Sequence, residues 1–157
     1  MLLVFAAGCS LSLSWREYTV GTTHRLTDPR FQLAVKVIRR SFILLVVATV
    51  INVVVWGWAV AWYWNILHFI ALVQIVLYLL ARWGGAYAVG SAALVSLTSG
   101  FWYAPLQRLG TQGWFGEILV GDLSSPHIWP LLPWFCIPAM GYLFGQYRER
   151  LCTLLTA

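Results

Sequence analysis

Residues 41–81, SFILLVVATVINVVVWGWAVAWYWNILHFIALVQIVLYLLA, decide the fold, because these 41 consecutive residues include no Asp, Glu, Lys or Arg. About 20 apolar residues suffice for one helix to cross the hydrocarbon core of a bilayer, so the run is long enough for two helices. Aromatic rings that prefer the membrane–water interface gather in its middle: Trp56, Trp58, Trp62, Tyr63 and Trp64. The run predicts transmembrane helices over 41–61 and 65–81, joined by a tight hairpin.

Two more spans are expected outside this run. The segment 86–103 is uncharged and rich in Gly, Ala and Ser, including Gly90, and small residues let helices approach closely. The segment 129–146 is also uncharged, and Pro130, Pro133 and Pro138 predict a kinked start. The apolar segment 1–14 is shorter than a full span. The expected fold is therefore all-α: one polytopic transmembrane helix bundle over 1–157, with four full spans and a short N-terminal hydrophobic segment.

Composition agrees with a membrane environment. The chain is 61% hydrophobic and 10% charged, whereas soluble domains contain about a quarter charged residues. Its net charge is +5, but the basic residues lie between apolar runs and do not form one face of a soluble domain. This arrangement points to lipid headgroups and excludes nucleic acid as the expected partner.

The basic residues also predict an orientation, because positive charge collects in cytoplasmic loops. The stretch 15–40 and the positions after later spans are rich in positive charge: Arg16, Arg25, Arg30, Lys36, Arg39, Arg40, Arg82, Arg148 and Arg150. The hairpin at 62–64 has no basic residue, and the loop 105–128 has one. We therefore expect an integral membrane protein with a cytoplasmic C-terminus.

Signatures of familiar soluble enzymes are absent from the sequence. There is no G-x-G-x-x-G, Walker, H-E-x-x-H or G-x-S-x-G element. The three cysteines form no C-x-x-C pair and lie near no histidine at metal-ligand spacing, so no metal site is expected.

Polar side chains inside predicted spans are the candidates for chemistry. Asn65 and His68 are three residues apart, on one face of the second expected helix. They could bind a polar ligand or move a proton, although a histidine satisfied by water or by the amide is also common there. Asn52 and Gln74 are expected to make interhelical hydrogen bonds.

Three strings carry a family resemblance: WNILHFIALVQIVLYLL at 64–80, HIWPLLPWFCIPAMGYLFG at 127–145, and FAAGCSLSLS at 5–14 with a following basic stretch that ends in IRR. They resemble bacterial members of the heparan-α-glucosaminide N-acetyltransferase family, in this order and over most of the chain. The resemblance implies a polytopic enzyme in a bacterial inner membrane that moves an acetyl group from cytosolic acetyl-CoA to an amino sugar across the membrane. It places the catalytic histidine in a stretch with no matching position here, so segment 1–14 is expected to be the end of a shortened scaffold.

Two functions follow. The main hypothesis is a non-catalytic accessory or structural subunit of a larger membrane complex, in which 25 aromatic residues contact lipid, pigment or other subunits. The alternative is an acetyl-CoA-dependent N-acetyltransferase, with His68 and Asn65 as catalytic candidates or His127 in that role. Arg25, Arg30, Arg39 and Arg40 would then bind the CoA phosphates. A transporter or channel is a weaker hypothesis, because the expected spans hold no acidic residue.

Overall fold

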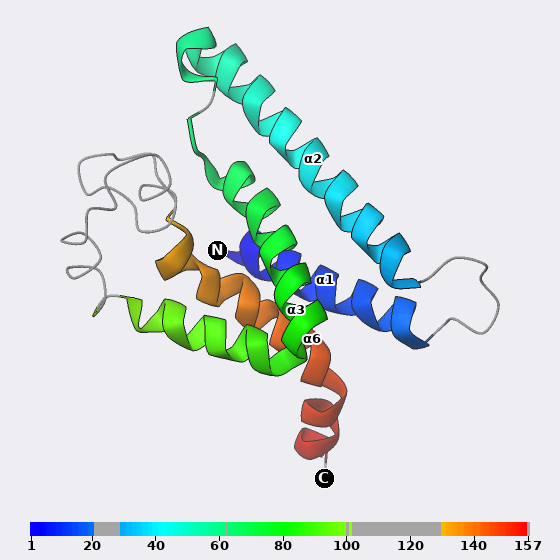
Figure 1. Ribbon diagram of the computed structural model, residues 1–157. Helices are drawn as coiled ribbons and strands as arrows, with labels where there is room; N and C mark the ends of the chain where they lie inside the picture. The colour runs from blue at the N-terminus through cyan, green and yellow to red at the C-terminus, as the bar shows by residue number, and fades with distance from the viewer. Residues whose placement is uncertain (21–28, 62, 100, 102–129, 157) are drawn as a thin grey trace.

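The computed structural model describes residues 1–20, 29–61, 63–99, 101 and 130–156. For residues 16–20, 29–30 and 149–156 it describes the backbone alone. These residues form helices and no strand: α1 (Leu2–Val20), α2 (Pro29–Trp56), the short 3-10 helix η1 (Trp58–Val60), α3 (Ile66–Leu97) and α6 (Leu131–Thr156). Figure 1 shows α2 and the first part of α3 side by side, with α1 and α6 crossing below them. The all-α prediction is confirmed for the described part of the chain.

Helix α2 is longer than its expected span at the basic end. It begins at Pro29, and proline suits the first position of a helix because its missing N–H would have no partner there. The stretch that carries Lys36, Arg39 and Arg40 is therefore helical and is not the loop that the charge pattern suggested. The helix ends at Trp56, before Gly57, whose φ of 88° lies in the left-handed region that glycine tolerates.

Helix α3 covers nearly all of the expected span 65–81 and the first part, 86–97, of the expected span 86–103. Gly85 interrupts it with φ 59° and ψ −147°, so the helix consists of two parts, 66–84 and 86–97. Figure 1 shows the chain changing direction sharply between these parts. At 1.5 Å per residue, the first part is about 28 Å long, close to the thickness of the hydrocarbon core.

The turn at Gly85 leads to a prediction. Gly85→Ala is expected to destabilise the protein by about 1–2 kcal/mol, because the backbone conformation is one that a Cβ disfavours, although a Cβ would meet open space there. The measurement is the thermal unfolding midpoint in detergent. An unchanged midpoint would mean that the sharp change of direction does not need glycine.

The closest helix pair is α1 with α6. A Cβ added to Gly8 would collide with the backbone carbonyl of Pro138, and one added to Gly141 would collide with that of Phe5. A Cβ at Gly145 would lie 2.7 Å from Ser12 Oγ. Small residues thus bring the two backbones together. We expected this kind of packing in 86–103, but a Cβ at Gly90 would meet nothing within 4 Å, so that prediction is wrong for Gly90.

Helix α6 also joins the second part of α3. The Ser96 hydroxyl donates to the Leu132 carbonyl and accepts from the Cys136 N–H at 2.9 Å. In a regular α-helix the Cys136 N–H would donate directly to the Leu132 carbonyl, four residues earlier. Here the Ser96 hydroxyl lies between these two groups. The kinked start that the prolines predict remains a prediction, since Leu131–Thr156 forms one helix with Pro138 inside it.

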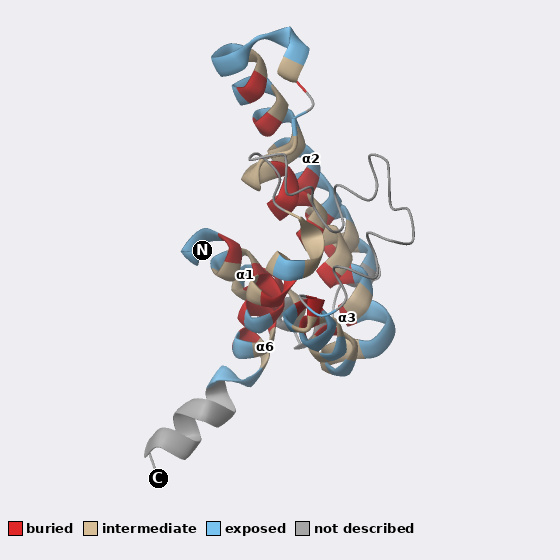
Figure 2. Cartoon of the chain, turned by 90° about the vertical axis from the view of Figure 1, so that its left-hand side faces the viewer, coloured by how far each residue is buried: buried red, intermediate tan, exposed pale blue. Residues whose placement is uncertain are grey.

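Burial separates the bundle into an inner and an outer side. Figure 2 shows buried residues concentrated where α1, α3 and α6 meet. The inner side includes Phe69, Leu77 and Tyr142, each at most 2% exposed. The outer side of α2 is exposed and apolar: Phe42, Ile43, Val46, Val47, Val50, Ile51, Val54 and Val55.

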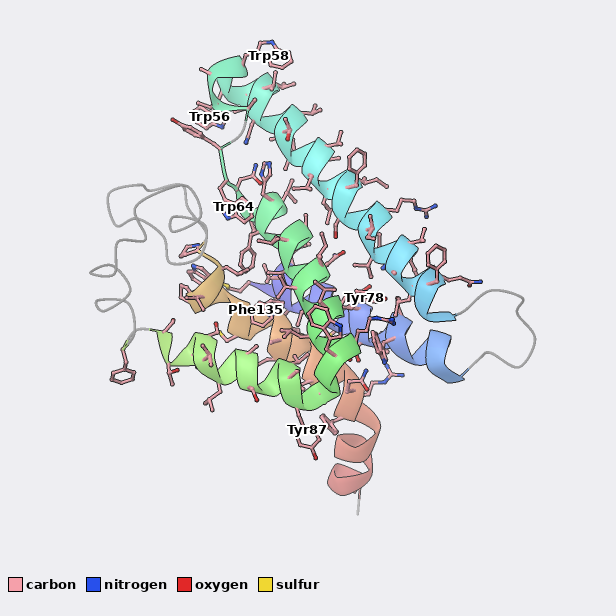
Figure 3. All side chains as sticks on the ribbon, in the orientation of Figure 1. Trp56, Trp58, Trp64, Tyr78, Tyr87 and Phe135 are labelled. Carbon is pink, nitrogen blue, oxygen red and sulfur yellow. The ribbon has the colours of Figure 1, made fainter. Side chains whose placement is uncertain are left out.

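Two helices are long and apolar enough to cross a membrane: Phe31–Trp56 in α2 and Ile66–Leu97 in α3. Among the described residues, α1 offers only the shorter apolar helix Leu2–Trp15. Four full spans are therefore not supported by helix length and composition. Figure 3 shows Trp56 and Trp58 at the hairpin end of the bundle and Tyr87 at the opposite end of the first part of α3, as expected for rings at two interfaces.

Candidate functional sites

A chain of polar side chains connects the end of α2 to the start of α3. Asn52 Nδ2 donates to the carbonyls of Tyr63 at 2.7 Å and Ala61 at 3.3 Å. Asn65 Nδ2 donates to Asn52 Oδ1 at 2.9 Å, and Asn65 Oδ1 lies 3.1 Å from His68 Nδ1. The interhelical hydrogen bond predicted for Asn52 is confirmed, and its partner is one of the two catalytic candidates.

Asn65 holds this arrangement in place because it also caps α3. Its Oδ1 accepts from the backbone N–H groups of Leu67 at 2.9 Å and His68 at 3.2 Å. Such a cap satisfies donors that the first helical turn leaves without partners. The His68 side chain is 6% exposed and stacks on Trp64, with ring centroids 5.8 Å apart; Figure 3 shows Trp64 at the start of α3. The structure thus brings Asn65 and His68 together, as their spacing predicted.

A second polar site is a small, partly open cleft between α1, α2 and α3, whose enclosed space is about the size of one water molecule. It is lined by two basic residues from α2, two serines from α1, a glutamine from α3 and four apolar residues: Lys36, Arg40, Ser10, Ser14, Gln74, Ala7, Leu11, Leu33 and Val37. Lys36 Nζ donates to Ser14 Oγ at 3.3 Å. The cations and hydroxyls on opposite walls are a donor set suited to an oxyanion.

Only part of the predicted arginine set reaches this cleft. Arg25 lies outside the described residues. Arg30 lies in the first turn of α2, where the structure describes its backbone alone. Arg39 and Arg40 are both exposed, but only Arg40 lines the cleft. Lys36 was not among the predicted site residues. The i, i+4 spacing of Lys36 and Arg40 placed them on one helix face and could have identified the pair.

Other site predictions have simple outcomes. Gln74 lines the cleft between α1, α2 and α3. The interhelical hydrogen bond expected for it remains a prediction. His127 lies outside the described residues. No group of three or more His, Cys, Asp or Glu side chains that could hold a metal ion is found in the described part of the chain.

Comparison with known proteins identifies the family. The family model for heparan-alpha-glucosaminide N-acetyltransferase, catalytic, matches residues 1–154. The chain belongs to this family. No curated protein and no solved structure matches it. The resemblance carried by the motifs at 64–80 and 127–145 is thereby confirmed.

Membership of the heparan-alpha-glucosaminide N-acetyltransferase family explains the apolar helices. The chain is a membrane acyltransferase-like protein, since α2 and α3 have the length and composition of membrane-crossing helices and the match covers nearly all residues. Each polar site collects several polar side chains within a largely apolar bundle, and polar groups in membrane helices are candidates for function.

Proposed function

We propose that this chain acts in a membrane-bound acyltransferase that moves an acetyl group from acetyl-CoA to the amine of a sugar. The observation that carries the proposal is the cleft in which Lys36 and Arg40 face Ser10 and Ser14. Phosphate oxygens are bound in proteins by such cations and hydroxyl donors. The cleft is therefore the proposed site for phosphate groups of acetyl-CoA, which supplies the acetyl group as a thioester.

The size of the cleft limits what it holds. The enclosed part of the cleft has room for about one water-sized group. A single phosphate oxygen of acetyl-CoA could reach Lys36 and Arg40 there, and the rest of the molecule would have to lie outside the cleft. Gln74 lies on α3 six residues after His68, about 9 Å along the helix axis. The rest of the donor would then extend toward the hairpin end, where we propose that His68 accepts a proton from the acceptor amine as the amine attacks the acetyl carbon, while Asn65 orients the imidazole. The bond from the acetyl carbon to sulfur breaks, and CoA leaves as the thiol after its sulfur takes up that proton.

We also propose the arrangement of the chain in the membrane. The basic end of α2 faces the cytoplasm of a bacterial cell, the C-terminus lies on the same side, and the hairpin near Trp58 faces outward. The two parts of α3 and helix α6 would complete four spans. This orientation puts the proposed phosphate site on the side where acetyl-CoA is made.

The double variant Lys36→Ala/Arg40→Ala is expected to weaken acetyl-CoA binding by about 10- to 100-fold for each lost charge-assisted hydrogen bond. The measurement is binding of radiolabelled acetyl-CoA to the full chain in nanodiscs. Arg39→Ala is the matched control, because it removes a neighbouring exposed arginine that does not line the cleft. Equal losses in the control and the double variant would overturn the proposed site and indicate general charge attraction.

A second candidate function is a non-catalytic accessory subunit. It is favoured by the apolar outer side of α2, where only 22% of the most apolar window is buried within the chain. Lipid would cover this side equally well. Mild-detergent purification from native membranes, followed by native mass spectrometry, separates the two. Stoichiometric comigration with a large complex supports a subunit, whereas recovery alone, with acetyl-CoA raising the unfolding temperature, supports an acyltransferase.

A further inference from the structure

The hydrogen bonds around Asn52 fix the direction of its side-chain amide. The group at 2.7 Å from the Tyr63 carbonyl and 3.3 Å from the Ala61 carbonyl must be the NH₂, because carbonyl oxygens only accept hydrogen bonds. Exchanging the oxygen and nitrogen would set an acceptor against two acceptors. Asn52 Oδ1 therefore faces Asn65.

The orientation of the Asn52 amide determines the orientation of the Asn65 amide. Its Nδ2 donates to Asn52 Oδ1 at 2.9 Å, so its Oδ1 must face the other way. The backbone agrees independently, since the N–H groups of Leu67 and His68 both donate to Asn65 Oδ1. Two separate constraints thus identify the atom next to His68 as an acceptor.

The acceptor in turn selects the tautomer of His68. Nδ1 lies 3.1 Å from Asn65 Oδ1, so Nδ1 must carry the proton. In the neutral ring Nε2 then holds the lone pair. A free neutral imidazole in water favours the other tautomer, with the proton on Nε2. The network therefore works against the intrinsic preference of the ring.

The position of the ring leaves Nε2 for a ligand. Within the described part of the chain, the hydrogen bonds of His68 involve its backbone N–H and Nδ1, and none to Nε2 is found. Stacking on Trp64 and burial restrict rotation of the ring. His68 Nε2 is also not among the fully buried polar atoms of the described residues, so a group that donates a hydrogen bond can reach it from outside.

We infer that Asn52 is a positioning residue that acts through Asn65 to hold His68 Nε2 as a hydrogen-bond acceptor for an amine N–H or a hydroxyl O–H of a ligand at the hairpin end of the bundle. This inference rests on the proposed acyltransferase function for the identity of the ligand, the acceptor sugar. It does not rest on that function for the tautomer, which follows from hydrogen bonds alone.

The tautomer is tested by nitrogen-15 NMR of the full chain labelled at histidine, in nanodiscs at a pH where imidazole is neutral. His68→Gln assigns the signal among the three histidines. The wild type is expected to show a protonated Nδ1 and an unprotonated Nε2. Asn52→Leu removes the acceptor for Asn65 Nδ2 while the Leu67 and His68 N–H groups still hold Asn65 Oδ1, and it is expected to shift part of the ring population toward the Nε2-protonated form. Asn65→Leu removes the acceptor beside Nδ1 itself and is expected to shift most of that population. A wild-type ring protonated on Nε2 would overturn the inference.

A control variant separates positioning from a general effect on α2. Thr49→Val lies about one turn earlier in α2, where the Thr49 hydroxyl donates to the Leu45 carbonyl of its own helix, and is expected to leave the tautomer unchanged. If Asn52→Leu is folded and leaves the tautomer unchanged, Asn52 has no positioning role.

The ligand is tested by titrating glucosamine into the labelled protein, with N-acetylglucosamine, which lacks the free amine, for comparison. Glucosamine is expected to shift the Nε2 signal, and His68→Gln is expected to weaken its binding by about tenfold, as for the loss of one hydrogen bond of about 1.4 kcal/mol. The absence of an Nε2 shift with saturating glucosamine would overturn the ligand assignment. Failure of acetyl-CoA binding alone would instead count against the proposed function and leave the tautomer result intact.

Discussion

Replacing Gly141 by alanine is expected to destabilise the protein by about 3 kcal/mol, whereas the same replacement at Gly90 is expected to be neutral or slightly stabilising. The added Cβ at Gly141 would overlap the backbone carbonyl of Phe5. A backbone atom cannot rotate away as a side chain can, so α1 and α6 would have to separate. Separation would also break the contact in which Cys9 Sγ donates to the Gly141 carbonyl at 3.1 Å.

Gly90 is a close control because both glycines lie inside helices and neither has a positive φ. A Cβ at Gly90 meets nothing within 4 Å, so only the gain in helix propensity remains there. The measurement is the unfolding midpoint of each variant in the same detergent. A similar small effect at both positions would mean that α1 and α6 do not pack as closely as the structure indicates.

This helix pair shows what hydrophobicity could not predict. Apolar runs identify the segments that leave water, but lipid is as apolar as leucine, so the runs do not say which helices pair. The signals were present in Gly8 on α1 and in Gly141 and Gly145, four residues apart on α6, since each of these glycines faces residues of the other helix so closely that a Cβ would collide with them. We instead expected close packing around Gly90, on the basis of composition without a partner.

The candidate sites were predicted to different degrees. Asn65 and His68 were found from their three-residue spacing, but the helix begins one residue later than expected, so Asn65 meets His68 as the N-cap of α3. Their link to Asn52 depends on how the hairpin closes, and no period in the sequence encodes that. Lys36 was counted only as a charge for topology, since the sequence does not reveal that α1 brings Ser14 to within 3.3 Å of it.

The helix boundaries differ for a similar reason. The run of residues 41–81 predicted where the chain is apolar, and α2 and α3 lie there. Charged residues were assigned to a loop, but the first turns of α2 carry Lys36 and Arg40 toward the cleft while they remain helical. Long basic side chains can lie at the end of a membrane helix because their charged groups extend to the interface.

The outer side of α2 gives a test of the membrane assignment itself, by placing a lysine at Val50. Val50 is 53% exposed and lies near the middle of the stretch between the basic end of α2 and Trp56. In water, such a surface replacement changes stability by no more than about 0.5 kcal/mol. At the centre of a bilayer, lysine costs about 3 kcal/mol relative to valine, which corresponds to roughly a hundredfold change in the fraction of inserted helix.

Val35→Lys is the matched control, because Val35 is also a valine on α2 and is 48% exposed. It lies next to Lys36 at the basic end, where a lysine can reach the headgroups, so its effect is expected to be small. The measurement is membrane insertion of each variant during synthesis, scored by glycosylation sites on either side of α2. Equal insertion of the two variants would contradict a transmembrane α2, whereas loss confined to Val50→Lys follows only if lipid surrounds the middle of this helix.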